Sequence, residues 1–308
     1  MITAIAEAWL LAWLLAATLG AGALAVLASG LLLRELWVEP LRPAFSAAGR
    51  AMPALVVLAL PLVALAPDLY PWTGKPRAVA IGVATAVILP LWCVLGRWLD
   101  RRAEKRWPAG IALMLVVLSA AIGFEDWALS RDPAWVASLQ GISLLEGGAA
   151  AFLGLAVLIL GCPEDPEART GLERALLTLG VFALWLWFVQ FVTVWAADLP
   201  PEAAWYLRRQ EGGWPWLKLG IAVPALLGAI ALSAVPQWRP WRMRAVCALL
   251  VMQHAAGLLW SVRPDAPLAP GAAEGSPGAV TDAIVIALVA LLLALALRLA
   301  GRGRADPV

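Results

Sequence analysis

The chain has 308 residues, of which 62% are hydrophobic and 14% are charged, and its formal net charge is +2. Soluble domains are roughly 45–50% apolar and about 25% charged, so this composition excludes an ordinary soluble domain and predicts an integral membrane protein. The basic residues lie in short loops and form no patch, which argues against a nucleic-acid partner.

Cysteine and histidine are scarce. Three scattered cysteines without a Cys-x-x-Cys offer no ligand set for an Fe–S cluster, and a single histidine, His254, cannot form a bis-histidine haem site. We therefore expect no metal site in this chain and no redox cofactor bound by this chain alone.

Charge-poor runs predict about nine transmembrane helices in a single polytopic membrane domain over residues 1–308. A spanning helix needs about 20 apolar residues, and helices satisfy their own backbone hydrogen bonds in lipid. The expected fold class is therefore all-α integral membrane. The predicted spans are about 4–33, 51–67, 77–96, 108–125, 134–161, 173–197, 215–236, 243–262 and 279–300.

The distribution of Lys and Arg predicts the orientation. Most of them fall in the loops after the odd-numbered spans and at the C-terminus, including the basic cluster between Arg97 and Arg106. The positive-inside rule places these loops in the cytoplasm. We therefore expect a multi-pass protein of a bacterial inner (cytoplasmic) membrane, with its N-terminus outside and its C-terminus in the cytoplasm.

Three polar residues lie deep in predicted spans and are candidates for proton transfer or quinone contact. Glu146 is near the middle of the fifth span, next to two glycines; Gln190 lies among aromatic residues of the sixth; His254 is near the middle of the eighth. Polar groups at membrane depth are costly and often functional. The alternative for Glu146 is a protonated carboxyl that packs between helices, and for His254 a hydrogen-bonded packing group.

Acidic residues also gather at the outer end of the fourth span. Glu125 and Asp126 could deliver or collect protons there, or could simply be solvated. Asp132 precedes Pro133, which predicts that Asp132 caps the N-terminus of the fifth span. Glu7, Lys218 and Asp282 lie close enough to span ends for us to expect that they reach the interface.

Eleven of the eighteen tryptophans fall near predicted span ends, where an interfacial aromatic belt is the expected role. For Trp185, Trp187 and Trp195, inside the sixth span, we expect contact with lipid or packing between helices.

Two segments together resemble a known family. One runs from Phe124-Glu-Asp-Trp127 through Asp132-Pro133 to Trp135, and the other runs from Trp187 to Trp195 and then through Leu199-Pro-Pro-Glu202 to Trp205-Tyr206. Both look like the ActF-type membrane subunit of bacterial alternative complex III, the quinol:cytochrome c oxidoreductase (quinone-binding subunit 2). That subunit belongs to the NrfD/polysulfide-reductase-like superfamily. Ala134, where the family has a histidine, marks the chain as a divergent member, and it would also be a shortened one.

The resemblance implies more than the residues alone. It implies two NrfD-like four-helix bundles with one peripheral helix. It also implies, as partners, other membrane subunits, a multihaem cytochrome and an Fe–S subunit. The resemblance also implies quinone or quinol as a ligand. The outer face would dock those partners through residues of the two segments: Asp132, Trp135, Asp198, Glu202, Trp205 and Tyr206.

Three functions remain open from the sequence. The first is a cofactor-free membrane subunit of a respiratory quinol-oxidising electron-transfer complex that contributes to quinone contact or proton movement. The second is a secondary transporter, which would require an internal repeat and paired broken helices; no paired halves are visible. The third is a purely structural or assembly subunit. In each case the lipid bilayer is a partner, and no residue is assigned to catalysis.

Overall fold

The computed structural model describes residues 2–101, 106–132, 135, 139–235, 239–268 and 279–302, and these form helices without a strand. A π-helical turn, η1 (Glu125–Leu129), continues the fourth helix; a second, η2 (Trp216–Ala222), leads into the eighth; and a 3-10 helix, η3 (Arg263–Leu268), follows the ninth. The α-helices are α1 (Ile2–Leu33), α2 (Val38–Leu69), α3 (Pro76–Arg101), α4 (Arg106–Phe124), α5 (Gln140–Leu160), α6 (Pro166–Ala197), α7 (Pro200–Arg208), α8 (Val223–Ser233), α9 (Pro240–Val262) and α10 (Ala279–Arg302).

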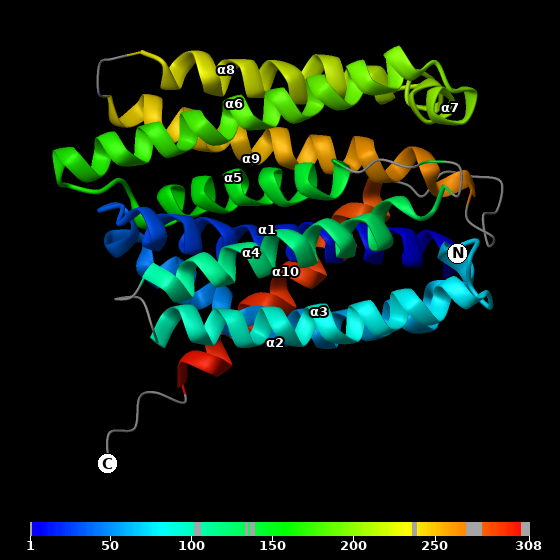
Figure 1. Ribbon diagram of the computed structural model, residues 1–308, viewed down its shortest axis with the longest axis horizontal. Coiled ribbons are helices and arrows are strands. Elements are labelled where there is room, and N and C mark those ends of the chain that lie inside the picture. Colours follow the sequence, from blue (N-terminus) through cyan, green and yellow to red (C-terminus); the bar gives the residue numbers. More distant parts are fainter. Residues whose placement is uncertain are drawn as a thin grey trace.

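The long helices form two groups of four that lie side by side (Figure 1). In the first group α1 packs against α2 and α4, and α3 closes the group by packing against the same two helices. In the second group α5 packs against α6 and α9, and α8 closes it in the same way. Contact between α1 and α5 joins the groups, and α10 lies outside against α1 and α2. This is the arrangement of two bundles and a peripheral helix that the resemblance implied.

Small residues let the two groups approach closely. Gly148 of α5 lies against the backbone carbonyl of Thr18 in α1, and Gly22 of α1 lies against the backbone of Gly148, so a Cβ at either glycine would overlap the facing helix. Gly147 faces α9, where an added Cβ would lie 2.6 Å from Nδ1 of His254. Glycine at such positions is a common way to pack membrane helices tightly. Gly147 and Gly148 thus permit the close packing of α5 on α9 and α1.

Eight helices of the described chain are long and apolar enough to cross a membrane. They correspond to the first eight predicted spans, and the ninth prediction coincides with α10, which has a shorter apolar stretch at Thr281–Leu292. The all-α membrane fold is therefore confirmed. The prediction underestimated two helices at their N-terminal ends: α2 begins at Val38 and α6 begins at Pro166. Both starts include charged residues, which a search for charge-poor runs excludes.

The predicted cap of the fifth span is wrong. The described part of α5 begins at Gln140, and the residue before it, Leu139, makes no side-chain cap. Asp132 is instead buried, and its carboxylate accepts a hydrogen bond from the guanidinium of Arg208. The remaining part of the prediction, Pro133 and the start at 134, lies outside the described residues.

Apolar side chains are exposed along the outer helices, as expected for surfaces that face lipid. α6 is an example, with Trp185, Phe188 and Trp195 all at least half exposed. Trp107 and Trp241, two of the tryptophans near predicted span ends, are exposed, and for these two the aromatic belt stays a prediction. It is wrong for five others, which are buried within the chain because they pack on helices or on one another: Trp37, Trp127, Trp135, Trp205 and Trp260.

Candidate functional site

A cluster of arginines and carboxylates, most of them buried, lies at the end of the bundle where α7 is found; we call it the arginine–carboxylate cluster. It joins α1, the turn after η1, the end of α7, η3 and α10. Its described members are four arginines and four acids, so their formal charges balance: Glu7, Arg131, Asp132, Arg208, Arg209, Arg263, Asp265 and Asp282.

Arg209, like Arg131, is fully buried in the cluster. Its guanidinium donates to both carboxylate oxygens of Asp265, at 2.7 and 3.2 Å, and to the backbone carbonyls of Trp205, Trp260 and Ser261 at 2.6–3.2 Å. It also lies over the ring of Trp205, 3.3 Å from the ring centroid. Burial lowers the pKa of Arg209 to about 10, and the negative charge of Asp265 opposes that shift. The guanidinium therefore stays charged at neutral pH and connects α7, α9 and η3.

A second part of the cluster connects α1 and α10. Arg131 donates to the carboxylate of Glu7 and to the backbone carbonyl of Val262. Arg263 lies 3.6 Å from the other oxygen of Glu7 and pairs with Asp282. We had expected Glu7 and Asp282 to reach the membrane interface. For Glu7 that expectation is wrong, because its carboxylate is buried and held by arginines. Asp282 is half-buried, and its approach to the interface stays a prediction.

The two family-like segments meet beside this cluster. The ring of Trp135 stacks on that of Trp205, with centroids 4.2 Å apart and planes at 12°, and Tyr206 packs edge-on against both rings. Burial raises the pKa of the Tyr206 hydroxyl to about 12, although the charge of Arg209 acts in the opposite direction. Two segments that are distant in the sequence therefore form one packed unit.

This packing changes the expected docking face. Asp132, Trp135 and Trp205 are buried by the chain itself and provide no exposed surface, so their assignment to a docking face is wrong. Asp198 is exposed in a left-handed backbone conformation at the end of α6, with φ of 50°, and Glu202 and Tyr206 are half-buried on α7. A docking role for these three residues stays a prediction.

The acidic pair Glu125 and Asp126 lies at the same end, in the π-helical turn η1, and both side chains are half-buried. Neighbouring η1 residues are tied to other helices: Tyr70 donates from its hydroxyl to the backbone carbonyl of Trp127, at 2.7 Å. The structure therefore places the pair within a turn that is tied to a neighbouring helix. A proton-transfer role for the pair stays a prediction.

Glu146 and His254 are close to one another in the centre of the molecule, where α5 packs against α1 and α9. His254 makes a 2.9 Å hydrogen bond between Nε2 and the hydroxyl of Thr18, which confirms that it is hydrogen-bonded in the core. Glu146 is buried, and its Oε1 has no hydrogen-bond partner among the described residues. Gln253, next to His254, also has a buried oxygen without a partner. The two central candidates thus lie on packed helices of the core, where Gly147, the neighbour of Glu146, faces His254.

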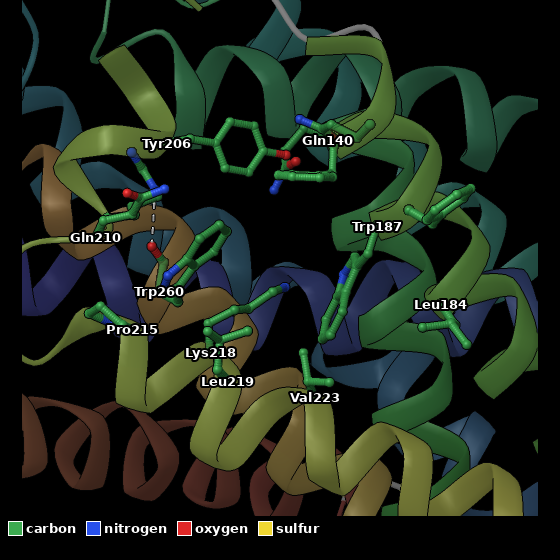
Figure 2. Close-up of a pocket in the computed structure, with 14 residues that line it drawn as sticks. Gln140, Leu184, Trp187, Tyr206, Gln210, Pro215, Lys218, Leu219, Val223 and Trp260 are labelled. Atoms are coloured by element: carbon green, nitrogen blue, oxygen red, sulfur yellow. Dashed lines mark hydrogen bonds between the residues drawn. The ribbon is translucent and has the colours of Figure 1, made fainter. Parts of the chain in front are cut away.

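Gln190 belongs to a different site, a cavity of about 470 Å³ between α6, α7, η2 and α9; we call it the aromatic cavity (Figure 2). Its walls are mostly aromatic and aliphatic, with a few polar groups. The lining residues are Gln140, Leu184, Trp187, Phe188, Gln190, Phe191, Tyr206, Arg209, Gln210, Pro215, Lys218, Leu219, Val223 and Trp260. The cavity lies next to the arginine–carboxylate cluster, because Arg209 belongs to both.

Lys218 is the polar residue of this cavity whose role the sequence did not reveal. Its Nζ lies over the ring of Trp187, 3.0 Å from the centroid, and 4.6 Å from the centroid of Trp260 (Figure 2). We had expected it to extend toward the membrane interface, and that expectation is wrong because η2 directs it inward. The signal available in the sequence was a lysine within an apolar run that also contains Trp214 and Trp216.

Within the described ranges no group of three His, Cys, Asp or Glu residues could hold a metal ion. The chain matches no protein-family model and no curated protein.

Proposed function

We propose that this chain is a cofactor-free integral membrane subunit of a respiratory quinol-oxidising electron-transfer complex, similar to the ActF-type subunit of alternative complex III. The observation that supports this most is the contact between the two family-like segments. The stacking of Trp135 on Trp205 and the ion pair between Asp132 and Arg208 give those residues a shared structural role at one end of the bundle. The two groups of four helices with a peripheral α10 also agree with the proposal.

In this proposal the α7 end of the bundle faces outward in a bacterial inner membrane, and the C-terminus is cytoplasmic. The exposed Asp198 and the half-buried Glu202 and Tyr206 would contact the multihaem cytochrome and the Fe–S subunit of the same complex. Exposed acidic groups favour association with a basic partner surface and mainly raise the association rate. The buried arginine–carboxylate cluster would hold this surface in a fixed shape.

The interior polar groups would serve quinone contact or proton movement. Glu146 and His254 lie together in the core, whereas Gln190 lines the aromatic cavity, so the proposal assigns them to two different places. Quinone or quinol is the ligand that the chain would meet. The haem and Fe–S cofactors would belong to the partners.

Affinity purification of the full-length chain in mild detergent tests the proposal. We expect multihaem and Fe–S proteins to co-purify, detected by haem staining and by electron paramagnetic resonance. The variant Asp198→Asn/Glu202→Gln removes two carboxylate charges at the α7 end and should lower the yield of partners. The matched control is Glu164→Gln/Glu167→Gln, which removes two exposed charges at the opposite end and should leave it unchanged. A preparation of the wild type without haem or Fe–S proteins would overturn the proposal.

A further inference from the structure

We propose that the aromatic cavity binds the oxygen-bearing head of a membrane amphiphile, with Lys218 and Gln190 as its hydrogen-bond donors. The inference rests on the proposed function only in its choice of ligands, because quinones and lipids are the molecules that surround a quinol-oxidising membrane complex. The cavity itself carries the argument. It lies in the second group of helices, and neither Glu146 nor His254 is among its lining residues.

One buried hydrogen-bond donor at the cavity has no acceptor among the described residues. Gln190 is 6% exposed and lines the cavity, yet its Nε2 has no hydrogen-bond partner among the described residues. A buried amide N–H without an acceptor is unfavourable, and native structures satisfy most such groups. An acceptor oxygen supplied by a ligand in the cavity would satisfy this one.

The charged side chains of the cavity favour a ligand with electron-rich oxygen. Among the described residues, two cations line the cavity, Arg209 and Lys218, and no carboxylate does. Arg209 is already neutralised by Asp265, at 2.7 Å, from outside the cavity. The described contacts of the Lys218 ammonium are the faces of Trp187 and Trp260. Cation–π contact compensates only part of the cost of desolvating an ammonium group. The cavity is therefore selective for a head that brings electron-rich oxygen to Lys218.

The backbone around Lys218 has an uncommon conformation. Lys218 lies in the π-helical segment η2, and π-helical turns are rare and are frequently found at functional sites. One extra residue per turn rotates the following side chains relative to a regular α-helix. In η2 this places Lys218 over Trp187 of the neighbouring helix α6.

The volume and the opening of the cavity suit a ligand from the membrane. The volume of about 470 Å³ is in the range of small-molecule sites, which is roughly 300–1,000 Å³. Phe188, Phe191 and Leu219 line the cavity and are each more than half exposed on the outer surface of their helices. The cavity therefore opens on the apolar surface of the bundle rather than only at its end. A ligand would enter from lipid, with its tail left in the bilayer.

Two kinds of membrane molecule share this chemistry: a quinone, with carbonyl oxygens on a flat ring, and a phospholipid, with phosphate oxygens. The indole faces of Trp187 and Trp260 favour the flat ring. Figure 2 shows both rings at the cavity beside Lys218. The experiment therefore includes one arm for each source.

The full-length chain would be reconstituted in nanodiscs and labelled in two arms, one with an azido-naphthoquinone carrying a decyl tail and one with a diazirine-labelled phosphatidic acid. Each label would be competed with its unlabelled analogue, and adducts would be located by peptide mass spectrometry. We expect a competed adduct on α6 or η2, between Trp187 and Val223. A quinone adduct or a phosphatidic acid adduct at that place each supports the site and identifies its source.

Variants then test the donors. Lys218→Met and Gln190→Leu should each weaken labelling at least about tenfold in apparent Kd, the factor that follows from losing one good hydrogen bond. Lys75→Met, at an exposed lysine in the loop after α2, is the matched control and should label like the wild type. Val223→Phe fills the cavity without altering either donor and should also abolish labelling. It provides the test if a donor variant fails to fold, as judged by gel filtration.

The inference is overturned if neither label gives a competed adduct in the cavity, or if Lys218→Met and Val223→Phe label as strongly as Lys75→Met. This outcome is distinct from failure of the proposed function. Co-purification of haem and Fe–S proteins tests membership of a complex, whereas labelling of the isolated chain tests the cavity alone.

Discussion

Replacing Arg209 by methionine should be among the most destabilising single changes at the α7 end. The substitution removes five hydrogen bonds, two to Asp265 and three to backbone carbonyls. It also leaves the carboxylate of Asp265, which is 0% exposed, with Arg208 at 3.4 Å as its remaining ion-pair partner. Removing one member of a buried ion pair typically costs about 3–5 kcal/mol. We expect Arg209→Met to lower the free energy of unfolding by about that amount.

The assay is unfolding of the detergent-solubilised chain by SDS, followed by tryptophan fluorescence. Arg42→Met is the matched control because it makes the same substitution at an exposed ion pair with Glu39, at 3.2 Å. Exposed pairs contribute roughly 0–1 kcal/mol. The double variant Arg209→Met/Asp265→Leu removes both buried charges and should recover part of the lost stability. If the free energies of unfolding of Arg209→Met and Arg42→Met differ by less than about 1 kcal/mol, the cluster does not hold this end together as we argue.

Three further predictions concern the core, the tyrosines and the helix contacts. Glu146→Gln should lower proton translocation or quinol turnover while leaving assembly intact, and unchanged activity would remove the relay hypothesis. Burial raises the pKa of Tyr70 and raises that of Tyr206 to about 12, so ultraviolet titration of the folded chain should show little tyrosinate at pH 11. Because the unfolded chain loses these protons near pH 10, the free energy of unfolding should fall as the pH rises above 10; tyrosinate already formed in the folded chain at pH 10 would contradict this. Gly148→Ala should destabilise the chain by about 1–3 kcal/mol through overlap with α1, whereas Gly82→Ala, in open space on α3, should be neutral or slightly stabilising; equal thermal stability of these two variants would refute the packing argument.

The membrane helices could be predicted because hydropathy is additive along the chain. A run such as Ala175–Ala197 shows its length and apolar character without knowledge of its neighbours, and it falls within α6 as observed. Helix starts were predicted less well, because α2 and α6 extend beyond the apolar run into residues that can be charged outside the membrane.

The functional side chains were harder to place because their partners are distant in the sequence. The Asp132-Pro133 pair suggested a local helix cap, but the carboxylate of Asp132 also pairs with Arg208, 76 residues away. Nothing local to Asp132 indicates that arginine. Lys218 fails for a related reason. The sequence shows roughly how deep a residue lies in a span, but the direction of its side chain depends on the π-helical turn and on the facing Trp187.

The arginine–carboxylate cluster and the aromatic cavity are structurally connected, because Arg209 belongs to both. Its guanidinium holds the backbone of Trp260, the residue whose ring forms a wall of the cavity beside Lys218. It is also the cavity cation whose charge Asp265 neutralises, which leaves Lys218 as the cation available to a ligand. Arg209 thus has two roles: its hydrogen bond holds the backbone of Trp260, and its pairing with Asp265 leaves Lys218 as the cavity's other cation. An oxygen-bearing head that enters from lipid would therefore be drawn toward Lys218 and Gln190.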